Sequence, residues 1–225
     1  HAYERILAVG AGKASAAMAQ ALEEVLGARL SGGHINTKYG FAVPLKLLGL
    51  SQAAHPIPDA AGIEGTQRMV ELIRGADEKT LIFFLASGGG SALMPFPVEG
   101  VSLAEKQRTT GLLLGANIKE LNAVRKHLSQ VKGGQFARAA FPATVISLMV
   151  SDVIGDPLDV IASGPTVADA STFGNCHDIL RAHGVLDKVP DSVRLHIERG
   201  VAGDIPETPK PGDAALAQCQ NLVIA

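Results

Sequence analysis

An apolar strand pattern that runs into a loop almost without side chains constrains this chain more than any other feature. Residues 81–86 are apolar without interruption, and they are followed by Ser87, Gly88, Gly89, Gly90 and Ser91. Apolar residues on both faces are typical of a strand buried in a parallel sheet. The loop offers two hydroxyls and several unobstructed N–H groups before an expected helix, an arrangement that favours an anion. A plain glycine-rich turn is the other interpretation.

Expected strands and helices alternate along the chain. Strands are expected at residues 5–9, 80–86, 143–150 and 221–225, with one more inside residues 32–58. Helices are expected at residues 14–26, 63–74, 102–114, 118–131, 175–183 and 191–199. This alternation predicts an α/β fold with a mostly parallel sheet and helices on both faces. Ligands of such sheets bind beyond the carboxyl ends of the strands, so loops 10–13, 87–91 and 151–156 are the first candidates for a site.

Composition and charge exclude several classes of protein. The 20 Lys and Arg residues against 22 Asp and Glu residues give a net charge of −2, without the basic excess of a nucleic-acid-binding or membrane-binding surface. No apolar run approaches the roughly 18 residues of a membrane span. Cys176 and Cys219 are too few for a disulfide framework, so we expect a cytoplasmic protein.

Three prolines among residues 206–213 are typical of a linker. We therefore expect one domain over residues 1–205, then a linker and the start of a further region over residues 206–225. A strand at residues 221–225 would normally lead into another element, so we expect the chain to be part of a longer protein.

Lys13 follows the first expected strand and begins the first expected helix. The turn at residues 10–13 is not a P-loop, because Leu7 and Ala14 stand where that motif has Gly and Ser or Thr. Nor is it a dinucleotide fingerprint, because Ser15 holds the position of the third glycine. A cation at a helix N-terminus is unfavourable unless an anion binds beside it. An exposed lysine on a tight turn is the alternative.

The helix expected at residues 118–131 carries a polar stripe beside its apolar face. Asn122, Arg125, Ser129 and Lys132 follow one another at helical steps, and Lys126 stands four residues after Asn122. An amide, a guanidinium and two ammonium groups on one side of a helix predict a site for phosphate or carboxylate. A solvated polar face remains the alternative interpretation.

Carboxylates and a histidine lie in two further loops. Asp152 follows the strand at residues 143–150, where it would hold Mg²⁺ or accept a hydroxyl proton, and Asp156 and Asp159 are near enough in sequence to share a cation. Asp also suits caps and turns. Prolines between His55 and Asp59 stiffen that segment, which either holds both side chains toward a pocket or forms a structural turn.

Together these groups favour phosphoryl transfer, which depends on positioning and on neutralising the charge of the transferred group. The Gly-x-Ser-x-Gly elbow of a serine hydrolase does not occur in the sequence. No His and Cys cluster has the spacing of a metal site.

In this order, the motifs resemble the two-domain glycerate 2-kinases, a family also described as hydroxypyruvate reductases. The matching stretches are residues 9–15, 55–59, 87–93, 122–129, 132–134, 151–157 and 161–166. The resemblance implies a Rossmann-like domain followed by a smaller C-terminal domain, missing here, with the active site between them. It also implies ATP-dependent phosphorylation of D-glycerate at its 2-hydroxyl, with Mg²⁺.

The resemblance also implies roles for particular residues. Lys13 matches an essential lysine that binds phosphate or substrate, and we expect Arg125 and Asp152 to complete the catalytic set. Asp152 and Asp156 are the expected metal ligands. The residues expected to bind substrate or phosphate are His55, Ser87, Gly88, Gly89, Gly90, Ser91, Asn122, Lys126 and Lys132.

The expected partners are a small hydroxy acid and a nucleotide, with no nucleic acid or membrane, and a homo-oligomer is left open. Two other functions also stay open. One is an NAD(P)H-dependent hydroxypyruvate reductase, which the broken glycine fingerprint disfavours. The other is a non-catalytic module that binds phosphosugars or other anions.

Overall fold

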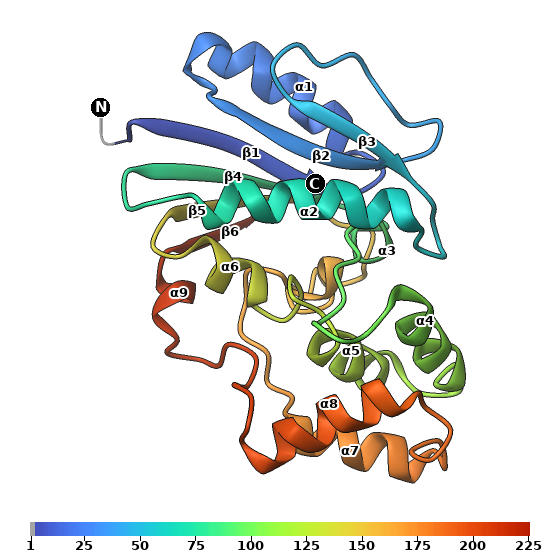
Figure 1. Ribbon diagram of the computed structural model, residues 1–225. Helices are drawn as coiled ribbons and strands as arrows, with labels where there is room; N and C mark the ends of the chain where they lie inside the picture. Colours follow the sequence, from blue (N-terminus) through green and yellow to red (C-terminus); the bar gives the residue numbers. More distant parts are fainter. Residues whose placement is uncertain (1–2) are drawn as a thin grey trace.

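A six-stranded sheet forms one end of the molecule in the computed structural model, which describes residues 3–225 (Figure 1). The strands are β1 (Arg5–Ala11), β2 (Gly32–Lys38), β3 (Gly49–Ala53), β4 (Thr80–Ser87), β5 (Thr144–Val150) and β6 (Cys219–Val223). Their order is β3-β2-β1-β4-β5-β6, and all five pairings are parallel. The predicted Rossmann-like α/β fold is therefore confirmed. The direction of the strand order reverses between β1 and β4, which is where ligands of such sheets bind.

Nine α-helices and two short 3₁₀ turns connect the strands among the described residues. The helices are α1 (Ser15–Leu26), α2 (Ala60–Arg74), α3 (Gly90–Leu93), α4 (Leu103–Leu112), α5 (Ile118–His127), α6 (Gln135–Ala140), α7 (Phe173–Ala182), α8 (Asp191–Ala202) and α9 (Ala214–Ala217). The 3₁₀ turns are η1 (Gly27–Arg29) and η2 (Ile161–Ser163). In this part of the chain, no helix has the length and apolar character to cross a membrane.

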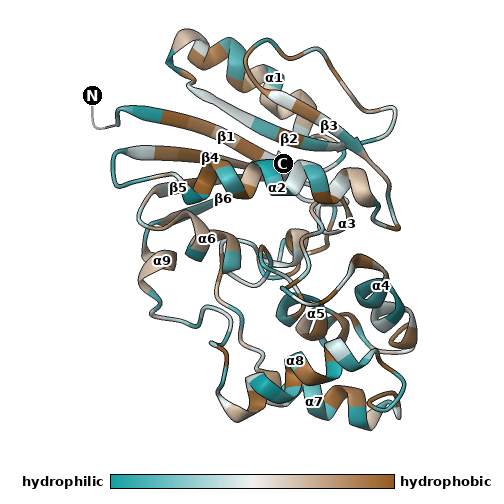
Figure 2. Ribbon diagram, viewed as in Figure 1, coloured by the Kyte–Doolittle hydropathy of each residue, from teal (hydrophilic) through white to brown (hydrophobic). Residues whose placement is uncertain are grey.

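The two faces of the sheet have separate hydrophobic cores. Leu7 and Val9 of β1 pack with α2 and α6 on one face, whereas Ile6 and Ala8 pack with α1 on the other. This alternation follows from the two-residue period of a strand, and Figure 2 shows how strongly apolar β1 and β4 are. The prediction of helices on both faces is confirmed for α1, α2 and α6.

Four helices do not cover the sheet but build a region of their own below it (Figure 1). Helices α4, α5, α7 and α8 pack against one another around a third core. Val124 and Leu128 of the α5 segment meet Leu180 of α7 and Ile197 of α8 there, and all four side chains are buried. The apolar stripes of these segments predict helices correctly. A stripe alone does not show whether its helix packs against the sheet or against other helices.

Residues 32–58 contain two strands, β2 and β3, rather than the single strand expected. The pattern misleads because β2 buries polar side chains in place of apolar ones. Asn36 of β2 is fully buried, and its amide nitrogen donates to the carbonyl oxygens of Gly62 (3.0 Å) and Leu93 (2.8 Å). These tertiary hydrogen bonds offset the cost of burying the amide nitrogen, whereas Oδ1 has no hydrogen-bond partner among the described residues.

Two helices end elsewhere than the sequence predicts. Helix α5 stops at His127 instead of continuing to residue 131, because the next residues turn back and Gln130 N donates to the carbonyl of Phe96. Helix α8 runs through Gly200, where the absence of a side chain admits the ring of Phe173, and ends at Ala202. Gly203 follows as the C-cap with a left-handed φ of 82°.

Residues 206–213, expected to form a linker, lie against α5 and α7. The Glu207 carboxylate accepts a hydrogen bond from Phe173 N at 2.7 Å and lies 3.0 Å from Nε2 of His127. Strand β6 then joins the same sheet beside β5. The predicted domain boundary at residue 205 stays a prediction. Residues 1 and 2, the first two of the predicted domain, lie outside the described residues.

Phe136 tests the sheet core. Its ring is fully buried and lies 4.6 Å from the ring of Phe84, centroid to centroid. We expect Phe136→Ala to lower the free energy of unfolding by about 3–5 kcal/mol, because a large cavity forms on the sheet. Urea denaturation measures this change. The matched control is Phe141→Ala, at a side chain 47% exposed, which should cost much less; equal losses would contradict this core.

Candidate functional site

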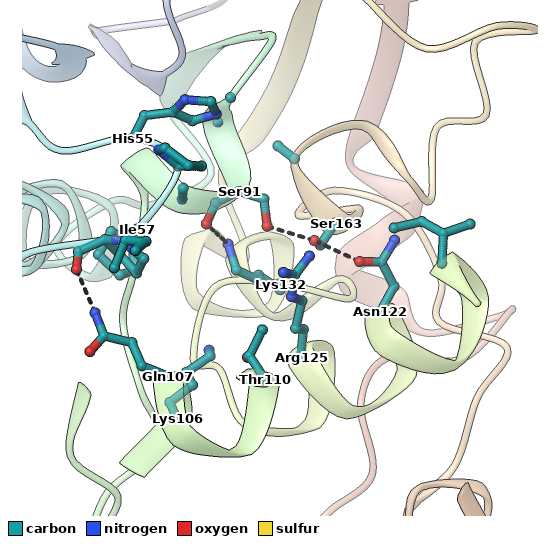
Figure 3. A pocket seen from close by; sticks show the side chains of 18 of the residues that line it. His55, Ile57, Ser91, Lys106, Gln107, Thr110, Asn122, Arg125, Lys132 and Ser163 are labelled. Atoms are coloured by element: carbon teal, nitrogen blue, oxygen red, sulfur yellow. Dashed lines mark hydrogen bonds between the residues drawn. The ribbon is translucent and has the colours of Figure 1, made fainter. Parts of the chain in front are cut away.

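A cavity of about 920 Å³ separates the carboxyl end of the sheet from helices α4 and α5 (Figure 3). Its size suits a small organic ligand or a cofactor. It brings together ten of the residues predicted from the sequence. They are His55, Ser87, Gly88, Gly89, Gly90, Ser91, Asn122, Arg125, Lys132 and Asp152. The loops after β4 and β5 thus meet the helical region across one cavity.

The three glycines after β4 let other groups approach the loop closely. A side chain at Gly88 would overlap the carboxylate of Asp152. A Cβ at Gly89, whose φ is +84°, would stand 2.9 Å from Cδ2 of His55. At Gly90 it would stand 2.7 Å from the carbonyl oxygen of Ala11. Glycine is required here because the site is assembled against the bare main chain.

Lys13 borders the cavity beside His55 and is not itself part of the lining. Its main-chain N–H donates to the carbonyl of Gly88 at 3.0 Å, and a Cβ at Gly89 would lie 3.5 Å from its Cε. Burial and the positive charges of Lys13 and Lys38 lower the pKa of His55. The imidazole is therefore mainly neutral at pH 7.

The glycines of the β1–α1 turn serve sheet packing. Side chains at Gly10 and Gly12 would overlap Leu85 and Ser87 of β4, so these positions admit β4 and do not form a free cradle for phosphates. Ser15 is fully buried, and its hydroxyl donates to the carbonyl of Leu85 at 3.0 Å.

Three buried or half-buried cations lie on the helical side of the cavity, Lys106, Arg125 and Lys132, and the exposed Arg108 of α4 lines it as well. The Lys106 ammonium donates to the carbonyl of Leu128 at 2.8 Å, and that of Lys132 donates to the carbonyl of Ser91 at 2.8 Å. No ion pair among residues 3–225 includes any of the three. Positive charge without a counterion on the walls of a cavity favours an anionic ligand.

Burial disfavours the charged form of both lysines. It lowers the pKa of Lys132 to about 7, with a further contribution from the charge of Arg125. Burial lowers the pKa of Lys106 well below its usual value, and Lys132 and Arg125 add to the effect. An anion in the cavity would offset both effects.

Lys106 is a site residue that sequence reasoning missed. It lies on α4, which the sequence predicts only as a capped helix, and Ser102 does cap it through a capping box with Glu105. The only available signal was that Lys106 and Thr109 lie on one face of this helix, which the structure shows to be buried.

A chain of hydroxyl groups joins the glycine loop to α5. The hydroxyls of Ser91 and Ser163 lie 2.8 Å apart, and Ser163 donates to Oδ1 of Asn122 at 3.5 Å (Figure 3). The Asn122 amide nitrogen donates to no acceptor among the described residues, so it remains free to bind a ligand. This chain orients the amide, because its oxygen is already engaged.

Besides Lys13, the predicted residues Lys126, Asp156 and Asp59 also lie outside the lining. The buried Lys126 ammonium pairs with Asp169 at 3.4 Å and with Asp159 at 3.7 Å, so it stabilises the fold behind the site. Asp156 is exposed in a turn with a φ of 49°. Asp59 caps α2 by accepting a hydrogen bond from Gly62 N at 3.0 Å. Its role is therefore structural, which was one of the two interpretations of the segment from His55 to Asp59.

Metal-binding groups are few around the cavity. Among residues 3–225, no three His, Cys, Asp or Glu side chains lie close enough together to hold a metal ion. Asp152 is the one carboxylate in the described lining.

Comparison with known proteins confirms the resemblance. A family model described as a domain of unknown function, DUF4147, matches residues 1–198. A glycerate 2-kinase of Pyrococcus horikoshii is 45% identical over 98% of this chain and 49% of its own length. A D-glycerate 2-kinase of Thermotoga maritima is 46% identical over 92% of this chain and 48% of its own. The chain therefore spans about half the length of these relatives.

Solved structures show the same fold. A crystal structure of a Pyrococcus horikoshii protein superposes with a TM-score of 0.93 at 45% identity, over 98% of this chain and 50% of that one. The crystal structure of a Thermotoga maritima glycerate kinase gives a TM-score of 0.89 at 44% identity, over 98% of this chain and 51% of that one.

The effect of the Lys13 charge on His55 can be measured by proton NMR. We expect His55 to titrate below its usual pKa, and we expect Lys13→Ala to move that pKa upward, because a nearby positive charge is removed. The control is Lys46→Ala, since Lys46 is exposed and does not affect this pKa. An unchanged His55 titration in Lys13→Ala would mean that the two side chains are not neighbours.

Proposed function

This chain belongs to the DUF4147 family and is a relative of the glycerate 2-kinases, and from that premise we propose that it carries much of the active site of an ATP-dependent glycerate 2-kinase. The reaction transfers the γ-phosphoryl group of ATP to the 2-hydroxyl of D-glycerate. One observation carries the proposal: the glycine loop lines one side of the cavity with Lys13 at its border, and Lys106, Arg108, Arg125 and Lys132 line the other. Such a cavity suits two anionic ligands that must meet.

The glycine loop and Lys13 suit the phosphates of the nucleotide. Main chain without side chains allows phosphate oxygens to approach N–H groups closely, and Lys13 adds a positive charge next to Gly89. Arg125 faces the same space and would neutralise charge that develops on the transferred phosphoryl group. These groups position the reactants, which is most of what phosphoryl transfer requires.

Asp152 is the group that we assign to the metal or to the substrate hydroxyl. Mg²⁺ in nucleotide sites is commonly held by one or two carboxylates together with the phosphates, so a single carboxylate beside the glycine loop fits an ion that enters with ATP. The ion would neutralise phosphate charge. Asp156 would have to move to become a second ligand, because it lies outside the lining.

Cys176 and Cys219 are both free thiols, which supports a cytoplasmic location. The ligands that this proposal requires are a small hydroxy acid and a nucleotide.

A coupled assay of ATP consumption with D-glycerate tests the proposal directly. We expect ATP consumption that depends on D-glycerate, with 2-phosphoglycerate as the product identified by NMR. Hydroxypyruvate and NADH in a parallel reaction test the reductase. Oxidation of NADH without ATP consumption would show that the protein is a reductase and not a kinase. Binding of D-glycerate without either reaction would indicate a binding module.

Lys13→Ala should lower kcat/KM for this reaction by about 100-fold or more, because a cation next to the phosphates is lost. The matched control is Lys188→Ala, at an exposed lysine between α7 and α8, which should leave turnover unchanged. Undiminished turnover in Lys13→Ala would remove Lys13 from the catalytic set.

Gly88→Ala should lower kcat by about tenfold to 100-fold, because the added methyl group displaces the Asp152 carboxylate. Stability should change by less than about 1 kcal/mol, since the end of an exposed side chain is what moves. Gly115→Ala is the control, because no atom lies within 4 Å of the added methyl group there. Equal activity of the two variants would exclude a role for Asp152.

A further inference from the structure

The helical wall of the cavity holds positive charge that the protein itself does not balance. Lys106 is 7% exposed and Lys132 only 2% exposed, yet neither has a carboxylate partner within the described residues. Arg125 donates no side-chain hydrogen bond to any of these residues and points toward Lys132 (Figure 3). Buried cations are normally paired, so an unpaired group of three indicates a ligand that supplies the charge.

We propose that Lys106, Arg125 and Lys132 form the subsite that binds the carboxylate of the hydroxy-acid substrate, with Lys106 as a specificity-determining residue. This inference rests on the proposed function, because it assigns one of the two anions of that reaction to one wall of the cavity. It identifies the group by which the protein distinguishes a hydroxy acid from an uncharged polyol.

Geometry favours a carboxylate over the nucleotide phosphates at this wall. Both lysines are nearly closed to solvent. Lys106 donates to one main-chain carbonyl, and Lys132 donates to two, those of Ser91 at 2.8 Å and Met94 at 3.2 Å, which leaves three N–H groups of the two ammonium groups for a small anion. The planar guanidinium of Arg125 matches the two oxygens of a carboxylate. A polyphosphate chain needs an extended open wall, which the glycine loop offers.

Asn122 extends the subsite toward the substrate hydroxyl. It lies one helical turn before Arg125 on α5, and its amide oxygen is occupied by the hydroxyl of Ser163. The amide nitrogen is then available to donate to a hydroxyl oxygen adjacent to the carboxylate. Cations and amide together select a 2-hydroxy acid.

Binding of the carboxylate to this wall takes up protons. Without a ligand the pKa of Lys132 is about 7 and that of Lys106 is well lowered, and a bound anion raises both. Affinity is therefore greatest below pH 7 and falls as the pH rises above it. The other charged or titratable groups of the lining are His55, Arg108 and Asp152; the pKa of His55 is already lowered, so it does not gain a proton between pH 7 and 8.

Isothermal titration calorimetry with D-glycerate, glycerol and inorganic phosphate tests the subsite. Each titration is run at pH 7 in two buffers that differ in ionisation enthalpy. We expect D-glycerate to bind with net proton uptake, more weakly at pH 8 than at pH 6, and glycerol not to bind. Phosphate binding that depends on Lys106, with no binding of D-glycerate, would overturn the carboxylate assignment.

The decisive variant is Lys106→Met, which keeps the length of the side chain and removes its charge. We expect D-glycerate to bind at least about tenfold more weakly, with less proton uptake, because a charged hydrogen-bond donor is lost. Lys119→Met on α5 is the matched control, since Lys119 is exposed and lies outside the lining. Wild-type affinity in Lys106→Met would overturn the proposal.

Thermal unfolding separates ligand binding from a structural role. If Lys106 serves the ligand, ligand-free Lys106→Met should unfold at the same temperature as the wild type or higher, because a buried amine whose charged form is unfavourable is replaced by an apolar side chain. A clearly lower unfolding temperature would show that Lys106 mainly holds the Leu128 carbonyl, and would overturn the proposal.

Failure of the subsite and failure of the kinase are distinguishable. Lys106-dependent binding of D-glycerate without any ATP consumption would overturn the kinase alone. Phosphorylation of D-glycerate with an unchanged KM in Lys106→Met would overturn the subsite alone.

Discussion

Close contact between β1 and β4 at their carboxyl ends is the constraint on which the site depends. Gly12 has no side chain, and β4 occupies the space that one would fill. The Ala14 N–H donates to the hydroxyl of Ser87 at 2.9 Å, and the Lys13 N–H donates to the carbonyl of Gly88 at 3.0 Å. These two hydrogen bonds connect the first turn to the glycine loop, so that a lysine and a row of bare peptide groups, more than 70 residues apart in sequence, share one rim of the sheet.

The helical wall depends in turn on a buried ionic network behind it. Lys126 pairs with Asp169, and the His127 ring lies between the carbonyl of Ala123 and the carboxylate of Glu207, at 2.8 and 3.0 Å. These contacts hold the last turn of α5 against neighbouring segments. Because they occupy one side of that turn, the residue just before them, Arg125, faces the cavity. Lys126, which the sequence predicts as a binding residue, thus helps to position Arg125, which lines the cavity.

The sequence predicts most of the fold and the sheet side of the site, because both depend on short stretches of consecutive residues whose pattern can be recognised. The apolar run before Ser87 predicts β4, and the glycines after it predict the loop that lines the cavity. The helical side is predicted only in part. Arg125 and Lys126 are adjacent, and tertiary packing alone decides which of them lines the cavity. Lys106 is missed because its burial depends on a carbonyl at residue 128 that no local pattern predicts. Lys132 is predicted at the end of a polar helical stripe, but α5 stops at His127 and Lys132 reaches the cavity from a loop.

The position of the cavity between separate hydrophobic cores has a mechanical consequence. Its sheet wall belongs to the two cores that flank the strands, and its α4 and α5 wall belongs to the third core. Changing the width of the cavity therefore requires a shift of one packed body against another, without disrupting the interior of either. A ligand that contacts both walls restricts the movement of one wall relative to the other. Any other interaction that restricts this movement therefore increases the affinity for the ligand by the same coupling free energy.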